Sequence, residues 1–250
     1  MIAPLQTVAI KSAIWFQGEA NSGDESYACL FQAMIEEWRT EWHKGTLGAT
    51  DPEFPFGFVQ LCSVKENGMG GFPIVRAAQA HVNATLPNTF MAVSYDLGDP
   101  TSPFGSVHSR HKQDVGHRLS QAGLAVVYGK DVEWTAPTMS AVCYDSSSHT
   151  VHVDVRVDSG GLQWQEAPSM WEVCDAGTSC APNTTDSWTP LNSTLSSPSS
   201  LSISVPSTVS TVTSLRFAWS DFPCEFKASQ VYAKTTQLPL APFLAPVSAC

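Results

Sequence analysis

The sequence predicts an α/β fold: a parallel sheet with flanking helices, followed by an antiparallel β-sandwich-like module. Two observations carry this prediction. Up to about residue 130, short apolar runs alternate three times with segments of helical periodicity, the pattern of strand–helix units joined by right-handed crossovers. Beyond residue 130 the helical periodicity ends, and runs of period two are separated by clusters of Ser, Thr, Pro and Asn. We therefore expect two parts, 1–130 and 131–250.

The first part contains three strand–helix units. Its strands are expected at 13–16, 56–62 and 89–95, and its second and third helices at 73–82 and 112–128. The first helix is expected to begin at Ser22 and Glu25, which have the spacing of a capping box, and to end at Gly45. In a parallel sheet ligands bind at the carboxyl ends of the strands, so the polar segments that follow the strands are the place to look for chemistry.

The second part is expected to be all β. Its clearest strands are 150–157, 201–205 and 214–219, which alternate apolar and polar residues. The proline-rich tail 238–243 cannot form regular structure, because proline lacks the N–H donor. We expect this tail to run as an extended strap across another surface.

Composition excludes several classes of function. The 250 residues are 43% apolar, enough for a core, and their net charge of −10 disfavours nucleic acid as a partner. No apolar run reaches the roughly 18 residues of a membrane span. Arg110 and Lys112 are a local exception to the acidic character. They would attract a substrate carboxylate or solvate the start of a helix, and the second interpretation is slightly favoured.

Several features are typical of the secretory pathway. There are seven cysteines, and Cys174 and Cys180 flank a short turn-forming stretch suited to a disulfide, although two free thiols are the alternative. Three glycosylation sequons begin at Asn83, Asn183 and Asn192. The first residues, 1–5, lack the basic and apolar regions of a signal peptide. We expect a secreted or lysosomal protein whose leader lies in a missing N-terminal part.

The first candidate site segment follows the first expected strand and contains Gln17, Gly18, Glu19 and Asn21. The glycine lets backbone N–H groups approach a ligand closely, and the two amides are neutral donors of the kind that stabilise an oxyanion. The carboxylate would orient a histidine or a substrate hydroxyl. The alternative is a polar turn with a purely structural role.

The second candidate segment follows the third expected strand. Acyl transfer needs an imidazole beside the nucleophile and often a carboxylate that fixes its tautomer. His108 is the candidate base, and Asp96 and Asp99 are the nearby acids. Alternatively the aspartates cap turns and the histidine is an ordinary surface residue. His108 and His111 have i, i+3 spacing but no third ligand, so we expect no metal site.

These segments resemble a known family. Residues 15–21, Trp-Phe-Gln-Gly-Glu-Ala-Asn, resemble the W-[YF]-Q-G-E-[SA]-N block of the sialate O-acetylesterases. Residues 107–112, Val-His-Ser-Arg-His-Lys, with 115–119, Val-Gly-His-Arg-Leu, resemble that family's I-H-P-R-x-K…V-x-x-R-L block. Further likeness lies at 1–5, 96–105, 216–226 and 238–243. The resemblance runs in order along nearly the whole chain and is weakest at about 135–210.

The resemblance implies a partial catalytic domain of the SGNH-hydrolase or flavodoxin-like type in 1–130 and a β-rich accessory module in 131–250. It implies hydrolysis of O-acetyl esters on sialic acids or sialoglycans through an acyl-enzyme intermediate, without a cofactor. Carried over residue by residue, His108 is the general base, and Gln17, Gly18 and Asn21 line the oxyanion region with support from Glu19.

The sequence departs from the family pattern in two ways. The family's nucleophile lies in a Gly-Gln-Ser-Asn block near the start of the catalytic domain, and no such block occurs here. We therefore expect a chain that is the later part of a longer enzyme and is inactive alone, with one edge of its sheet exposed. The residue three before the histidine is Gly105, not the common aspartate. This leaves a Ser–His dyad, or Asp96 or, preferably, Asp99 as the partner of His108.

Two hypotheses from other classes stay open on the sequence alone. One is an acetylesterase that acts on a glycan other than sialic acid. The other is a non-catalytic carbohydrate-binding protein that kept the fold and lost the nucleophile.

Overall fold

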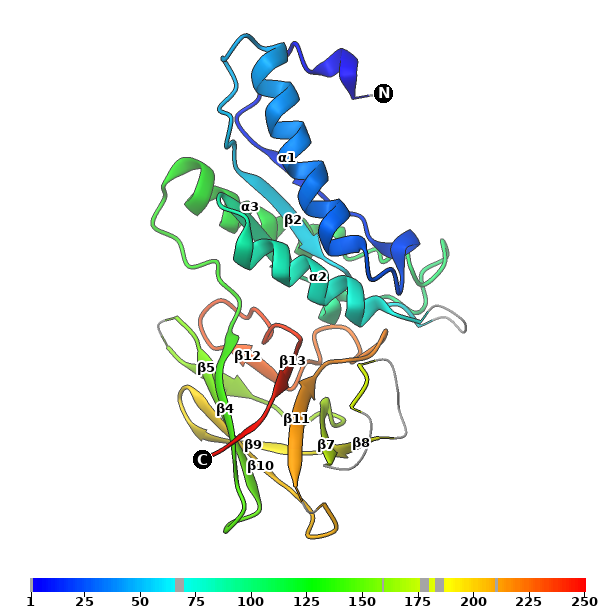
Figure 1. Ribbon diagram of the computed structural model, residues 1–250, viewed down its shortest axis with the longest axis vertical. Coiled ribbons are helices and arrows are strands. Elements are labelled where there is room, and N and C mark those ends of the chain that lie inside the picture. The colour runs from blue at the N-terminus through cyan, green and yellow to red at the C-terminus, as the bar shows by residue number, and fades with distance from the viewer. Residues whose placement is uncertain (1, 66–69, 159, 176–179, 183–186, 210) are drawn as a thin grey trace.

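The computed structural model describes residues 2–65, 70–158, 160–175, 180–182, 187–209 and 211–250 (Figure 1). The first part holds a parallel sheet of order β1-β2-β3, formed by β1 (Ala13–Trp15), β2 (Phe56–Gln60) and β3 (Thr89–Val93). Its helices are α1 (Tyr27–Gly45), α2 (Phe72–Thr85) and α3 (Lys112–Tyr128), with 3-10 turns at Ala3–Leu5, Glu19–Asn21 and Tyr95–Leu97. The predicted parallel sheet with flanking helices is confirmed.

Side chains of β2 alternate between two cores on opposite faces of this sheet. Phe56 and Phe58 pack with α1 and α2, and Val59 packs with α3. Gly57 lies on the α3 face beneath the ring of Phe90, where a Cβ atom would come within 2.1 Å of that ring. Two helices therefore cover one face of the sheet and one helix covers the other.

The start of α1 and the edge of the sheet test two expectations. The predicted capping box is wrong: α1 begins at Tyr27, and Ser22 Oγ instead donates to the carbonyl oxygen of Gly70. The end at Gly45 is confirmed. β1 is an edge strand of the sheet, and its Ile14 is 67% exposed, which agrees with the expected exposed edge.

The second part consists of antiparallel sheets, drawn below the helices in Figure 1. One sheet has the order β14-β4-β5-β10-β9 and a second the order β13-β11-β7-β8, with a β12-β6 ribbon beside them and β14 as a parallel edge strand. The first sheet is built from β4 (Thr138–Asp145), β5 (Thr150–Arg156), β9 (Ser193–Ser197), β10 (Ser200–Ser204) and β14 (Ser248–Ala249). The second and the ribbon use β6 (Leu162–Trp164), β7 (Trp171–Asp175), β8 (Trp188–Leu191), β11 (Val212–Phe217), β12 (Val231–Ala233) and β13 (Phe243–Pro246).

One core joins the two antiparallel sheets and reaches into the first part of the chain. Val153 and Leu201 of one sheet and Trp171 of the other belong to the same buried cluster, which is a sandwich arrangement. Tyr95, just after β3, belongs to this cluster as well, and its hydroxyl donates to the carbonyl oxygen of Leu240 at 3.0 Å. Leu240, in the tail where a strap was expected, is fully buried. The end of that tail is regular structure, contrary to the expectation, because Phe243 is the first residue of β13.

The cysteines and sequons are distributed as follows. Cys174 and Cys180 form the predicted disulfide, and a second bond joins Cys143 to Cys250 near the C-terminus. That second pairing spans 107 residues and could not be deduced from spacing. Among the sequons, Asn192 is exposed and Asn83 lies half-buried within α2, while Asn183 lies outside the described residues. No helix in the described ranges is long and apolar enough to cross a membrane.

Arg76 of α2 fastens the β-module to the parallel sheet. Its guanidinium is fully buried and donates to the carbonyl oxygens of Leu61 and Cys62, just after β2, at 2.8 and 3.1 Å. It also donates to those of Ser220 and Asp221 in the β-module, at 2.6 and 3.1 Å. Burial lowers the pKa of this side chain to about 10, so it stays charged at neutral pH.

Arg76→Met should destabilise the protein strongly, because four carbonyl oxygens, two of them buried, would lose a donor. We expect the free energy of unfolding to fall by about 3 kcal/mol or more, measured by urea denaturation. The matched control is Arg156→Met, since Arg156 is exposed on β5, and its effect should stay within about 0.5 kcal/mol. Equal effects of the two substitutions would contradict this role.

Candidate active site

Three loops leave the carboxyl ends of the parallel strands at one edge of the sheet. Phe16, directly after β1, packs in the cores on both faces, and Val107 of the loop after β3 packs in the core of α1 and α2. The Nζ atom of Lys112, the first residue of α3, lies 4.6 Å from the centre of the Phe16 ring. These contacts bring the first candidate segment beside the end of the second.

The turn after β1 depends on Gly18. This residue is buried and has a φ of 143°, a conformation that side chains with a Cβ rarely adopt. A Cβ atom here would lie 2.8 Å from Val75 Cγ1 of α2. The preceding carbonyl, of Gln17, accepts hydrogen bonds from Gln79 Nε2 at 3.1 Å and Tyr27 Oη at 3.2 Å. The turn is therefore fixed by two helices, and only glycine fits it without strain.

This turn presents a set of hydrogen-bond donors. Within the described residues, the backbone N–H groups of Gly18 and Glu19 make no hydrogen bond. Gln17 Nε2 donates to Asn21 Oδ1 at 2.7 Å, and Asn21 Nδ2 donates to Asp24 Oδ2 at 3.2 Å. Each amide nitrogen carries a second hydrogen. The arrangement has the donor chemistry of an oxyanion-binding turn.

His108 lies on a loop whose backbone is held in place while its side chain is exposed. Its N–H donates to the carbonyl oxygen of Gly105 at 2.9 Å, and its own carbonyl accepts from Ser102 Oγ at 2.7 Å. Ser109 Oγ donates to the carbonyl oxygen of Leu97 at 2.7 Å. The imidazole makes no hydrogen bond to any residue in the described part of the chain. A base with a fixed backbone and an unengaged ring is available for proton transfer.

Asp99 does not contact His108, contrary to the preferred assignment from the sequence. Its carboxylate accepts hydrogen bonds from Arg110 Nε at 2.6 Å, Nη2 at 3.0 Å and the backbone N–H at 3.1 Å. These bonds hold the pKa of the Asp99 carboxyl well below its usual range. Arg110 outcompetes an imidazole here because its planar fork matches both carboxylate oxygens. Asp99 thus shapes the loop that carries the histidine.

Asp96 is also engaged elsewhere. It is fully buried and forms a two-pronged ion pair with Arg118 of α3, at 2.6 and 2.8 Å. Tyr232 of the β-module donates its hydroxyl to the same carboxylate at 3.1 Å. Neither aspartate therefore orients the imidazole of His108 in this structure.

The β-module contributes to this edge through residues that the sequence patterns did not single out. The ring of Phe226 stacks on His111 with 3.8 Å between ring centres. Asp221 Oδ1 accepts from the N–H of Phe72 at 2.9 Å and so caps α2. The sequence signal for Asp221 and Phe226 was the resemblance of residues 216–226 to the family. The residue patterns assigned no role to that stretch.

A solved structure shares this architecture. The chain aligns over 98% of its length with 52% of the chain of a carbohydrate acetylesterase from Xanthomonas citri, with a TM-score of 0.79 and 27% identity. The fold of this chain is thus shared with a carbohydrate acetylesterase.

The family match is more specific. Residues 140–247 match the family model of the sialate O-acetylesterase C-terminal domain. The chain is 37% identical to the sialate O-acetylesterase of Mus musculus, over 99% of this chain and 46% of that protein. It is 35% identical to that of Homo sapiens, over 98% and 47%. The chain spans about half the length of these relatives. The resemblance is confirmed: this chain is a relative of the sialate O-acetylesterases and carries their C-terminal domain.

Gly18→Ala should strain the donor turn, because the new methyl group meets Val75 at a positive φ. We expect a loss of about 1–3 kcal/mol in the free energy of unfolding. Val75→Ala removes the methyl group that clashes, so the double variant should lose less than the sum of the two single losses, by at least about 0.5 kcal/mol. Strict additivity in thermal or urea denaturation would show that this contact does not constrain the turn.

Proposed function

We propose that this chain provides the base and the oxyanion-binding turn of a sialate O-acetylesterase with an SGNH-hydrolase-like catalytic domain. The observation that supports this proposal best is the meeting, at one sheet edge, of the donor turn at Gly18 and the loop of His108. The names of the relatives, sialate O-acetylesterase, and of the similar structure, a carbohydrate acetylesterase, agree with that chemistry.

The proposed reaction passes through an acetyl-enzyme. A serine hydroxyl attacks the carbonyl carbon of the acetyl ester, and His108 accepts the hydroxyl proton. The N–H groups of Gly18 and Glu19, with the amides of Gln17 and Asn21, bind the oxyanion of the tetrahedral intermediate. His108 returns the proton to the departing sugar hydroxyl. It then activates a water molecule that releases acetate from the serine.

The nucleophile of this scheme is not apparent at His108. No serine hydroxyl within the described residues is hydrogen-bonded to the imidazole, and the sequence contains no Gly-Gln-Ser-Asn block. We therefore propose that the serine comes from sequence outside these 250 residues. Activity tests accordingly use the natural gene product in full.

His108→Ala should abolish acetate release, because a nucleophile and its base act as a unit. We expect kcat to fall by roughly 10³-fold or more in the natural gene product, measured with an O-acetylated sialic acid. The control is His81→Ala, which removes an exposed histidine of α2. The 250 residues expressed alone should release no acetate. A rate for His108→Ala within tenfold of the wild type would remove this residue from the mechanism.

Lys112 is the group that we assign to the carboxylate of the sialic acid. Nearby cations are already matched by acids: Lys65 by Glu225 at 3.3 Å and Arg110 by Asp99 at 2.6 Å. Lys112 has no acidic partner within the described residues. It also opens α3, where the helix dipole disfavours a positive charge. An anionic substrate would supply the missing counterion beside Phe16.

The second candidate is an acetylesterase for a neutral glycan. The similar structure favours it, because that protein is a carbohydrate acetylesterase. The two candidates share the same chemistry at the ester and differ only in whether the sugar carries a negative charge.

Lys112→Gln should separate these candidates, because it removes the positive charge and keeps most of the side chain. For a sialate esterase, we expect the ratio of kcat/KM for O-acetylated sialic acid to kcat/KM for acetylated xylo-oligosaccharide to fall about tenfold, the effect of about 1.4 kcal/mol. Lys130→Gln, at an exposed lysine beyond α3, is the control. An unchanged ratio in Lys112→Gln, with xylan fragments preferred by the wild type, would support the neutral glycan.

We place the protein in a secreted or lysosomal compartment as part of this proposal. Its support is the pair of disulfides, since such bonds persist in oxidising compartments and are rare in the cytosol. Use of the exposed sequon at Asn192 would agree with the same route.

A further inference from the structure

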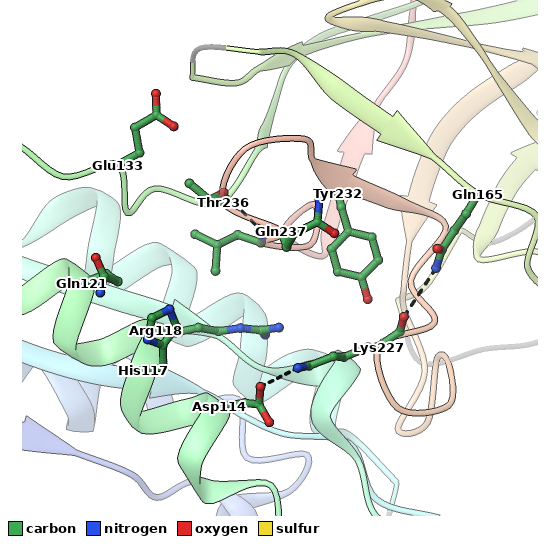
Figure 2. A pocket seen from close by; sticks show the side chains of 11 residues that line it. Asp114, His117, Arg118, Gln121, Glu133, Gln165, Lys227, Tyr232, Thr236 and Gln237 are labelled. Carbon is green, nitrogen blue, oxygen red and sulfur yellow. Dashed lines mark hydrogen bonds and ion pairs between the residues drawn. The ribbon is translucent and has the colours of Figure 1, made fainter.

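A polar cleft lies between α3 and the β-module, apart from the residues assigned above to catalysis (Figure 2). Its volume is about 380 Å³, within the range of small-molecule sites. One wall consists of α3 side chains, including His117 and Gln121, and the other of β-module residues, including Tyr232 and Thr236. Figure 2 shows these two groups of side chains facing the space between them.

The charges of this cleft are largely balanced. Lys227 forms an ion pair with Asp114 at 2.6 Å, and Arg118 is held by the buried carboxylate of Asp96 at 2.6 Å. The cations are thus already neutralised and provide little attraction for an acidic ligand. Lys112, in contrast to these two cations, has no acidic partner within the described residues.

Apart from the carboxylate of Glu133, the groups of this cleft that can meet a ligand are neutral and hydrogen-bonding. The Gln121 amide and the His117 imidazole make no hydrogen bond to a residue in the described part of the chain. Thr236 Oγ1 accepts only a long bond, at 3.4 Å, from the N–H of Leu238. Amide, imidazole and hydroxyl groups offer both donors and acceptors, which matches the hydroxyl groups of a sugar, each a donor and an acceptor.

The cleft begins close to the candidate active site. Lys227, at one end of it, directly follows Phe226, whose ring stacks on His111. Asp114, its partner in the ion pair, is two residues beyond Lys112 on α3. A ligand that extended from the catalytic edge past the His111–Phe226 stack would enter the cleft.

We propose that this cleft is a carrier-sugar site that binds the neutral hexose to which an acetylated acidic sugar is linked. The inference rests on the proposed esterase function, because that function places the acetylated residue at His108. It assigns two sites of different chemistry to one substrate: a cationic site at Lys112 for the acidic sugar, and a polar site whose cations are already paired with acids for its carrier.

Lactose is a suitable probe, since it is neutral and carries no acetyl group. Lactose should bind the natural gene product, as measured by calorimetric titration, and Gln121→Ala and His117→Ala should each weaken its binding about tenfold. Both side chains reach solvent, so the fold should tolerate their removal. Gln113→Ala is the control, because Gln113 is exposed on α3 and does not line the cleft. No binding of lactose to the wild type, or equal binding by all three variants, would overturn the proposal.

A kinetic experiment separates this inference from the proposed function. In Gln121→Ala, the ratio of kcat/KM for O-acetylated sialyllactose to kcat/KM for free O-acetylated sialic acid should fall about tenfold. If Gln121→Ala and His117→Ala hydrolyse both substrates with the same ratio of kcat/KM values as the wild type, the carrier-sugar site is rejected and the esterase function is retained. Lactose binding that is lost in Gln121→Ala, with no acetate released from either substrate by the wild type, would reject the esterase and leave the site.

Discussion

The buried ion pair between Asp96 and Arg118 is the interaction on which the arrangement of this molecule depends. Asp96 follows β3, Arg118 lies in the middle of α3, and Tyr232 of the β-module donates to the same carboxylate. Removing two charges from water is costly, and the cost is offset only when the geometry is good and the remaining donors are satisfied. Here Arg118 also donates to the carbonyl oxygen of Val93 at 2.6 Å. The ion pair therefore joins the end of β3, helix α3 and the β-module at one point.

This ion pair fixes the position of the loop that carries the candidate base, His108. The loop of His108 begins next to Asp96 and ends at the helix that carries Arg118, so both of its ends are fixed to the same ion pair. Within the loop, Asp99 and Arg110 form a second clamp. The backbone is thus constrained while the imidazole stays exposed. Function is commonly carried by loops that a rigid scaffold positions, and here the scaffold includes the β-module as well as the sheet.

The β-module accordingly forms part of the edge that carries the candidate active site. Asp221 caps α2, Phe226 stacks on His111, and Lys227 pairs with Asp114 of α3. These contacts come from a short run of residues more than 100 positions beyond the loops that they touch. Between the two parts lies a polar cleft whose cations, Arg118 and Lys227, are paired with acids, while the cation at Lys112 lies on the side of Phe16. The two surfaces therefore differ in charge, because the cations of the cleft are paired with Asp96 and Asp114 whereas Lys112 has no acidic partner in the described part of the chain.

The sequence by itself determined the elements and the chemistry-bearing segments. Alternating apolar runs, helical periodicity and the glycine at 18 are local features, and local features follow from backbone sterics and burial along a single element. Only the tertiary structure decided which side chains form hydrogen bonds and ion pairs with one another. Asp99 was expected to face His108 but lies against Arg110, and α2 is capped by Asp221 from 149 residues away. A carboxylate pairs with whichever donor best satisfies it after packing, and sequence separation carries no information about that competition.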